Sequence, residues 1–109
     1  MPYDEFLAER IRNILARYPG VIEKRMFGGV AFMLQGNLAC GVNGPDLIVR
    51  VGQEKNEAAL SRLHTRPFAM TGRPMSGWIL VTPAGWEKDD ELENWVKQGV
   101  EYALSLPAK

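Results

Sequence analysis

The sequence of 109 residues contains one cysteine and one histidine, and its 13 basic side chains equal its 13 acidic ones in number. A lone cysteine cannot form an internal disulfide, so nothing indicates an oxidising compartment. A net charge of zero argues against a protein that grips nucleic acid with its whole surface. One cysteine and one histidine cannot form a structural zinc site. We therefore expect no metal and no other cofactor.

Long apolar runs are also missing from the sequence. The longest, Val30–Leu34, is far shorter than the roughly 20 residues that cross a bilayer. The first twenty residues carry six charges and do not resemble a secretory signal. No repeat or low-complexity linker divides the chain, and its length is typical of one domain. We therefore expect a single cytoplasmic domain over residues 1–109 with no membrane partner.

Charge is distributed unevenly along the chain. Residues 21–83 carry seven basic and four acidic side chains, whereas residues 84–109 carry three basic and six acidic ones. The middle of the chain is thus mildly basic and its C-terminal end acidic. A solvated surface with uneven spacing would explain this pattern. A local basic surface, or attraction between the two parts in a homodimer, stays open.

Helical periodicity is clearest at the two ends of the chain. Apolar residues recur at helical spacing between residues 3 and 18, and Pro19-Gly20 ends that pattern. A last helix is predicted from Asp89 or Asp90 to Pro107, with acidic residues in its first turn. Gly99 falls on the apolar side of this helix, which indicates a close approach to the sheet. A shorter helix is predicted over Gln53–Leu63.

The middle of the chain is rich in predicted strands. They cover residues 24–27, 30–34, 38–42, 47–51 and 78–81, with a loop or short edge strand at 68–70. Short turns join the strands at 30–34, 38–42 and 47–51, so those three strands should be antiparallel. The sequence therefore predicts an α+β fold of two layers, in which helices pack on one face of one antiparallel sheet.

Residues suited to catalysis are few. Cys40 lies in an apolar strand, where a free cysteine usually behaves as a small buried hydrophobe. His64 ends a predicted helix, where a cap or surface role is the simpler explanation. Gly28-Gly29 precedes a strand and not a helix, so we interpret it as a turn or bulge and not a phosphate cradle. We expect no enzyme, no catalytic residue and no small-molecule substrate.

The segment from Arg62 to Met75 has an unusual composition. It contains three arginines and His64 but no acidic residue, interleaved with Phe68, Met70 and Met75. Arginines beside exposed apolar side chains are typical of an interface with protein or nucleic acid. Alternatively, the apolar side chains fill the core while the arginines reach water.

Five stretches together resemble the N-terminal domain of the TfoX/Sxy competence regulators. They are Arg25-Met-Phe-Gly-Gly-Val-Ala-Phe-Met33, Gly36-Asn-Leu-Ala-Cys-Gly-Val42, Leu47-Ile-Val-Arg-Val-Gly52, Arg66-Pro-Phe-Ala-Met-Thr-Gly-Arg-Pro-Met75 and Gly77-Trp-Ile-Leu-Val81. The resemblance runs from about Phe6 to Leu106. The combined order of these motifs is specific, although each piece alone is weak.

The resemblance implies a two-layer fold similar to that of secretion chaperones. It also implies a non-enzymatic domain linked to bacterial competence and transcription regulation. Full-length regulators of this kind carry a further C-terminal domain, so we expect this chain to be a stand-alone N-terminal domain. The matching positions recur in the family without a proven role: Arg25, Gly28, Gly29, Arg50, Gly72 and Arg73.

We therefore expect a regulatory interaction domain that binds a protein partner or a second copy of itself. The candidate interaction surface consists of Arg25, Arg50, Arg62, Arg66, Phe68 and Arg73. The alternative is a weak nucleic-acid-binding domain that uses a basic surface, with Arg25, Arg50, Arg66 and Arg73 as phosphate contacts.

Overall fold

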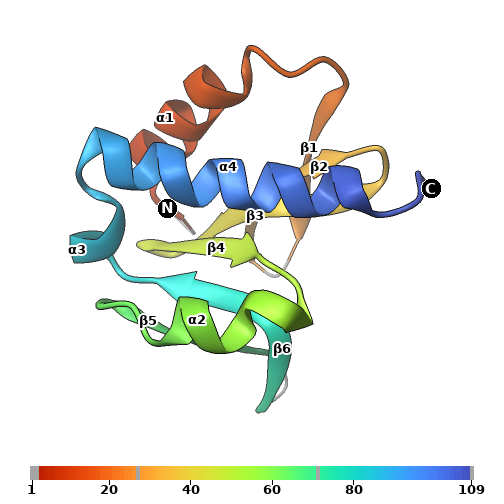
Figure 1. Ribbon diagram of the computed structural model, residues 1–109. Helices are drawn as coiled ribbons and strands as arrows, with labels where there is room; N and C mark the ends of the chain where they lie inside the picture. Colours follow the sequence, from red (N-terminus) through yellow and green to blue (C-terminus); the bar gives the residue numbers. More distant parts are fainter. Residues whose placement is uncertain (1–2, 27, 71, 109) are drawn as a thin grey trace.

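A single antiparallel sheet forms one layer of the fold, and the helices form the other (Figure 1). The computed structural model describes residues 3–26, 28–70 and 72–108. The sheet has six strands in the order β1-β2-β3-β4-β6-β5. The strands are β1 (Val21–Met26), β2 (Gly29–Leu34), β3 (Asn37–Asn43), β4 (Asp46–Arg50), β5 (Thr65–Met70) and β6 (Arg73–Val81). The predicted α+β architecture is confirmed.

The helical layer consists of two longer helices and several short turns. These are α1 (Glu5–Leu15), the 3-10 turn η1 (Gln53–Lys55), α2 (Asn56–Leu60), α3 (Pro83–Trp86) and α4 (Asp89–Ser105). In Figure 1, α4 crosses in front of β3 and β4, while α2 lies in front of β5 and β6. The helices therefore share one face of the sheet.

Strand register separates the two faces of this sheet, because directly paired residues point to the same side. Phe32 pairs with Cys40, Cys40 with Val49, and Val49 with Ile79, and all four belong to the main core beneath the helices. Helix α4 supplies the largest buried side chain of that core, Trp95. The residues between them on each strand face the other way.

The close fit of α4 on the sheet depends on Gly99. A Cβ atom at this position would overlap the backbone carbonyl of Ala39 in β3. Only a residue without a side chain allows the helix axis to lie this near the strand. The close approach expected for Gly99 is confirmed.

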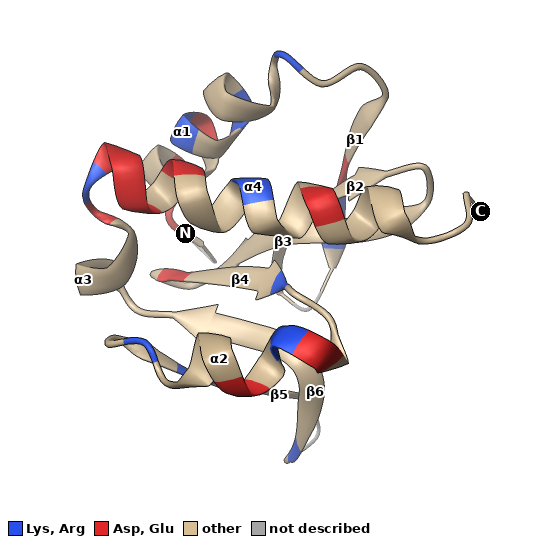
Figure 2. Cartoon of the chain, in the orientation of Figure 1, with Lys and Arg blue, Asp and Glu red and all other residues tan. Residues whose placement is uncertain are grey.

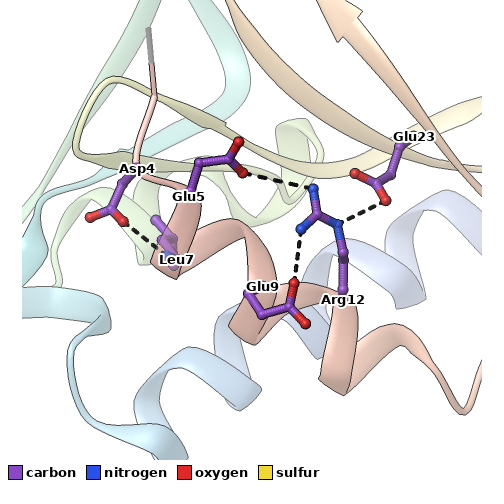
Figure 3. Close-up of polar contacts among 6 residues, drawn as sticks. All are labelled: Asp4, Glu5, Leu7, Glu9, Arg12 and Glu23. Atoms are coloured by element: carbon purple, nitrogen blue, oxygen red, sulfur yellow. Dashed lines mark hydrogen bonds and ion pairs between the residues drawn. The ribbon is translucent and has the colours of Figure 1, made fainter. Parts of the chain in front are cut away.

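Helix α1 is capped at its N terminus and joined to the neighbouring edge strand (Figure 3). The Asp4 carboxylate accepts a hydrogen bond of 3.0 Å from the Leu7 backbone amide and caps the helix. The Arg12 guanidinium donates to Glu23 of β1 at 2.9 Å and to Glu9 at 3.0 Å. These carboxylates, the Glu23 hydrogen bond above all, raise the pKa of Arg12. The network joins α1 to β1.

Two predicted elements differ from the structure. The helix predicted over Gln53–Leu63 is a 3-10 turn followed by a helix that ends at Leu60. The Ser61 hydroxyl donates to the Ala58 carbonyl at 2.7 Å just after the helix, and His64 has a φ of 66°. The chain therefore turns between Ser61 and His64. The segment around residues 68–70 is a full edge strand, β5, paired with β6.

Candidate functional site

The predicted surface residues occupy several separate places in the fold. Arg25 lies on the edge strand β1, paired with the core residue Val30 and so on the helix-bearing side. Arg66 lies on the opposite edge strand, paired with Leu80 on the other side of the sheet. Arg73 begins β6 beside the β5–β6 turn. These three side chains are exposed but do not form one cluster.

The remaining three predicted residues lie against aromatic rings. Arg62 places its guanidinium carbon 4.1 Å from the ring centroid of Trp95. Phe68 is buried and stacks on Trp78, with 6.1 Å between the ring centroids. Arg50 also lies over Trp78, at 5.3 Å from its centroid. Cation–π contacts of this kind stabilise the fold and hold each guanidinium in a defined plane.

Two arginines lie between pairs of aromatic rings. The Arg10 guanidinium carbon is 5.8 Å from the Phe6 centroid and 5.7 Å from the Trp86 centroid. Arg10 also donates to the Asp89 carboxylate at 2.8 Å and to the Glu87 carbonyl at 3.0 Å. Aromatic rings therefore contact this guanidinium, and protein oxygens accept hydrogen bonds from its N–H groups.

Arg50 has the same aromatic setting, because its guanidinium carbon lies 5.3 Å from the centroids of both Trp78 and Tyr102. Tyr102 belongs to α4, so the contact joins the end of β4 to the helical layer. Within residues 3–26, 28–70 and 72–108, no carboxylate or carbonyl accepts a hydrogen bond from this guanidinium. The edge of Arg50 thus faces a space that the protein does not fill.

That space is a pocket of about 630 Å³ between the end of β4, η1 and the C-terminal half of α4. Arg50, Trp78 and Tyr102 form its half-buried interior. Its rim is polar and exposed, and contains Gln53, Glu54, Lys55, Ser76, Glu101 and Ser105. A pocket of this volume is large enough for a small organic ligand.

Two buried glycines form part of the pocket wall. Gly52 and Gly77 each have a φ of 87°, a conformation that residues with a Cβ rarely adopt. A Cβ at Gly52 would overlap the Tyr102 ring, and one at Gly77 would lie 2.8 Å from the Gly52 carbonyl carbon. Gly52 and Gly77 lie far apart in the sequence, so their closeness in space could not be inferred from it.

Hydrogen bonds fix the backbone of this wall. The Gly77 amide donates to the Asn56 side-chain carbonyl at 2.8 Å, and the Gly77 carbonyl accepts from Val51 at 2.8 Å. The Gly52 amide donates to the same carbonyl at 3.2 Å. The pocket is therefore preformed and does not depend on loose loops.

The second face of the sheet, which carries no helix in the described part of the chain, is also apolar near its centre. Register places Ile48, Leu80, Ala31 and Leu38 on this side. Leu80 is half-buried, and the other three are buried. Further side chains of this open face are Ile22, Lys24, Met33, Asp46 and Arg66. Ile22 is 57% exposed.

Asp46 is the acidic member of the open face. Partial burial raises the pKa of this carboxyl group, and the nearby positive charge of Arg66 partly offsets that rise. The open face thus combines apolar side chains with Lys24 and the Arg66–Asp46 pair. Figure 2 shows a different character for α4, where acidic residues gather at the N-terminal end.

The structure separates the two residues that a nucleophilic site would need. Cys40 is fully buried beneath the helices, and burial raises the pKa of its thiol to about 12. A thiol in that setting is protonated at neutral pH and a poor nucleophile. His64 is exposed after α2, where its backbone carbonyl accepts a hydrogen bond of 2.9 Å from the Thr82 amide.

Among the residues that the structure describes, no group of three or more His, Cys, Asp and Glu side chains is placed to hold a metal ion. In that part of the chain, no helix is both long and apolar enough to span a membrane.

An open antiparallel sheet with every described helix on one face defines a small α+β domain, and comparison with known families identifies which one. The chain belongs to the TfoX N-terminal domain family, whose model matches residues 13–103. The match begins within α1 and ends within α4, so it includes every strand. No curated protein matches the chain. The resemblance found in the sequence motifs is confirmed, and the domain is of the competence-regulator type.

Proposed function

We propose that this chain is a non-enzymatic regulatory domain that binds a protein partner through the open face of its sheet. The observation that carries the proposal is the apolar character of that face. An antiparallel sheet with one solvated face normally alternates apolar and polar residues. Here the exposed Ile22 and the half-buried Met33 and Leu80 lie on the side without helices, around the buried Ile48 and Leu38.

The charges beside this apolar surface favour a particular partner chemistry. Lys24 and Arg66 carry positive charge on the exposed parts of the open face, while Asp46 is half-buried. An apolar protein surface with acidic groups at its edge would complement them. Family membership supports a role in regulation of transcription or DNA uptake, carried out in the cytoplasm.

The alternative of weak nucleic-acid binding is less well supported. Its four phosphate contacts would be Arg25, Arg50, Arg66 and Arg73, yet Arg25 and Arg66 lie on opposite sides of the sheet. Arg50 is also enclosed by two rings. Phosphates along one strand need cations on one continuous surface. A DNA titration at low salt should accordingly detect no binding, and therefore no affinity that falls as salt is added.

The proposal can be tested by photo-crosslinking in cells of the native host. A benzophenone amino acid replaces Ile22 or Lys24 on the open face, or Asn94 or Lys97 on the exposed surface of α4. We expect one discrete protein adduct from the first pair and none from the second. An adduct of twice the mass of the chain would identify a second copy as the partner.

Charge reversal provides the matched control. Arg66→Glu should reduce the adduct about tenfold, because like charges would then meet across the interface. Arg17→Glu makes the same change of charge on the helical layer and should leave the adduct unchanged. Equal crosslinking from both faces, or no adduct from either open-face position, would overturn the proposal.

A further inference from the structure

The comparison between Arg10 and Arg50 points to a ligand site. Both guanidinium groups lie between two aromatic rings at similar distances. Arg10 completes its hydrogen bonding with the Asp89 carboxylate at 2.8 Å, whereas Arg50 has no such partner in the part of the chain that is described. A half-buried guanidinium without an acceptor forgoes charge-assisted hydrogen bonds that a ligand could supply.

The geometry of the rings limits what that ligand can be. Trp78 is contacted by the Arg50 guanidinium and stacks on the Phe68 ring, and Tyr102 is contacted by Arg50 and lies close to Gly52. These contacts use ring surface that a nucleobase would need for stacking, which disfavours the usual mode of single-strand recognition. The unoccupied part of Arg50 is its in-plane N–H edge. That edge matches the two oxygens of a carboxylate.

The charges around the pocket distinguish a carboxylate from a polyanion. Lys55 adds a second positive charge to the lining, but Glu54 and Glu101 add two negative ones. A phosphate dianion would meet repulsion from these glutamates. A single carboxylate requires only one guanidinium, and the rim hydroxyls of Ser76 and Ser105 offer further polar contacts.

We propose that the Arg50 pocket binds the carboxylate of a free amino acid or of a peptide C terminus. Arg50 binds the two carboxylate oxygens, and Trp78 and Tyr102 hold its guanidinium in the required plane. A Cβ at Gly52 would overlap the Tyr102 ring and one at Gly77 would crowd the Gly52 backbone, so a side chain at either position would displace the pocket wall. Register places Arg50 and Trp78 on the same side of the sheet as Ile48 and Leu80, so the pocket borders the open face. The inference still does not depend on the proposed protein partner, because residues of this chain form the whole pocket.

An NMR titration of the full chain tests this inference without any variant. The probes are alanine, N-acetylalanine, alaninamide, trialanine, trialanine amide and inorganic phosphate. We expect saturable shifts of the Arg50 Nε–H signal and of the Gly52 and Gly77 amides with the carboxylate-bearing probes only. Tighter binding of alanine would identify a free amino acid as the ligand type, and tighter binding of trialanine a peptide C terminus.

Two variants with the same change of residue provide the control. Arg50→Lys keeps the positive charge but loses the planar fork, so its dissociation constant should rise about tenfold. Arg62→Lys makes the same change at Trp95, outside the pocket, and should bind as the wild type does. The inference is overturned by equal shifts with the amides, by stronger binding of phosphate, by no saturable shift, or by unchanged binding to a folded Arg50→Lys variant.

Discussion

Gly99 of α4 rests on the backbone carbonyl of Ala39 in β3, so closely that a Cβ at residue 99 would overlap that oxygen. A backbone atom within a paired strand cannot move aside as a flexible side chain can. The distance between the helix and the sheet is therefore set at this point. Every buried side chain of α4, Trp95 included, depends on it.

Replacing Gly99 by alanine should consequently destabilise the fold. Alanine favours a helix by about 1 kcal/mol over glycine, but the overlap with Ala39 should outweigh this, with a net loss of about 2 kcal/mol in the free energy of unfolding. Chemical denaturation measures the change. Lys97→Ala, on the exposed side of the same helix, is the control and should have little effect. A Gly99→Ala protein as stable as the wild type would contradict the packing described.

The buried thiol makes stability depend on alkaline pH. Burial raises the pKa of Cys40 to about 12 in the folded chain, whereas an unfolded cysteine ionises near 8.5. Between these values the unfolded state has released its proton and the folded state has not. The free energy of unfolding should therefore fall as pH rises through that window, by up to about 1.4 kcal/mol per unit.

The Cys40→Ala variant isolates this effect, because it lacks the titrating group but keeps all others. Its stability, measured by urea denaturation between pH 8 and 10, should decline less steeply than that of the wild type. Labelling gives an independent readout: a thiol reagent at pH 8 should modify Cys40 in denaturant and leave it intact in the native protein. Parallel pH profiles for the two proteins would argue against a buried, protonated thiol.

Asp46 should also affect stability through its charge. Its folded pKa is raised, so the ionised carboxylate destabilises the fold at neutral pH, and protonation relieves the cost as pH falls through the folded pKa. Asp46→Asn should accordingly raise the melting temperature at pH 7 by up to about 2 °C. The gain should vanish near pH 3, where both states of the wild type are protonated.

Arg66 provides the test of this mechanism, since its charge offsets the burial of Asp46. In an Arg66→Ala background, Asp46→Asn should stabilise the protein more than it does alone. Thermal melts of the four proteins form a double-mutant cycle that measures the coupling. Equal effects in both backgrounds would mean that the two side chains do not interact.

The Arg12 network is expected to make a small, salt-dependent contribution. Glu23→Gln removes the negative charge from the 2.9 Å contact that joins α1 to β1 and leaves at most a neutral hydrogen bond, so it should lower the free energy of unfolding by about 0.5–1 kcal/mol at low salt. The loss should shrink in 1 M salt because exposed ion pairs are screened. Glu57→Gln, at an exposed carboxylate with no ion pair among the described residues, is the control. Loss of stability that is unaffected by salt would point to packing instead.

Several features of the fold could be predicted because they depend on near neighbours. The short turns between residues 30 and 51 required antiparallel pairing, and helical spacing located α1 and α4. The helix predicted over Gln53–Leu63 was too long, because Ser61 and His64 turn the chain by local hydrogen bonding and backbone conformation.

The candidate pocket required information that the linear pattern does not contain. Arg50 was singled out from the sequence, but its partners Trp78 and Tyr102 lie in two other elements. The meeting of Gly52 and Gly77 likewise depends on β4 pairing with β6 across the helix that intervenes in the chain. Arg10 and Arg50 have similar aromatic surroundings, and they differ in whether a carboxylate accepts a hydrogen bond from the guanidinium.

The sequence by itself determined the α+β class, the family and the balance of charge, because composition, periodicity and local motifs carry that information. Its zero net charge conceals an acidic α4 and an open face with exposed Lys24 and Arg66. The tertiary structure alone decided which arginines lie between aromatic rings, and which of these, Arg50, has no hydrogen-bond acceptor among the described residues. Those properties arise from contacts between distant segments, which packing of the two layers brings together.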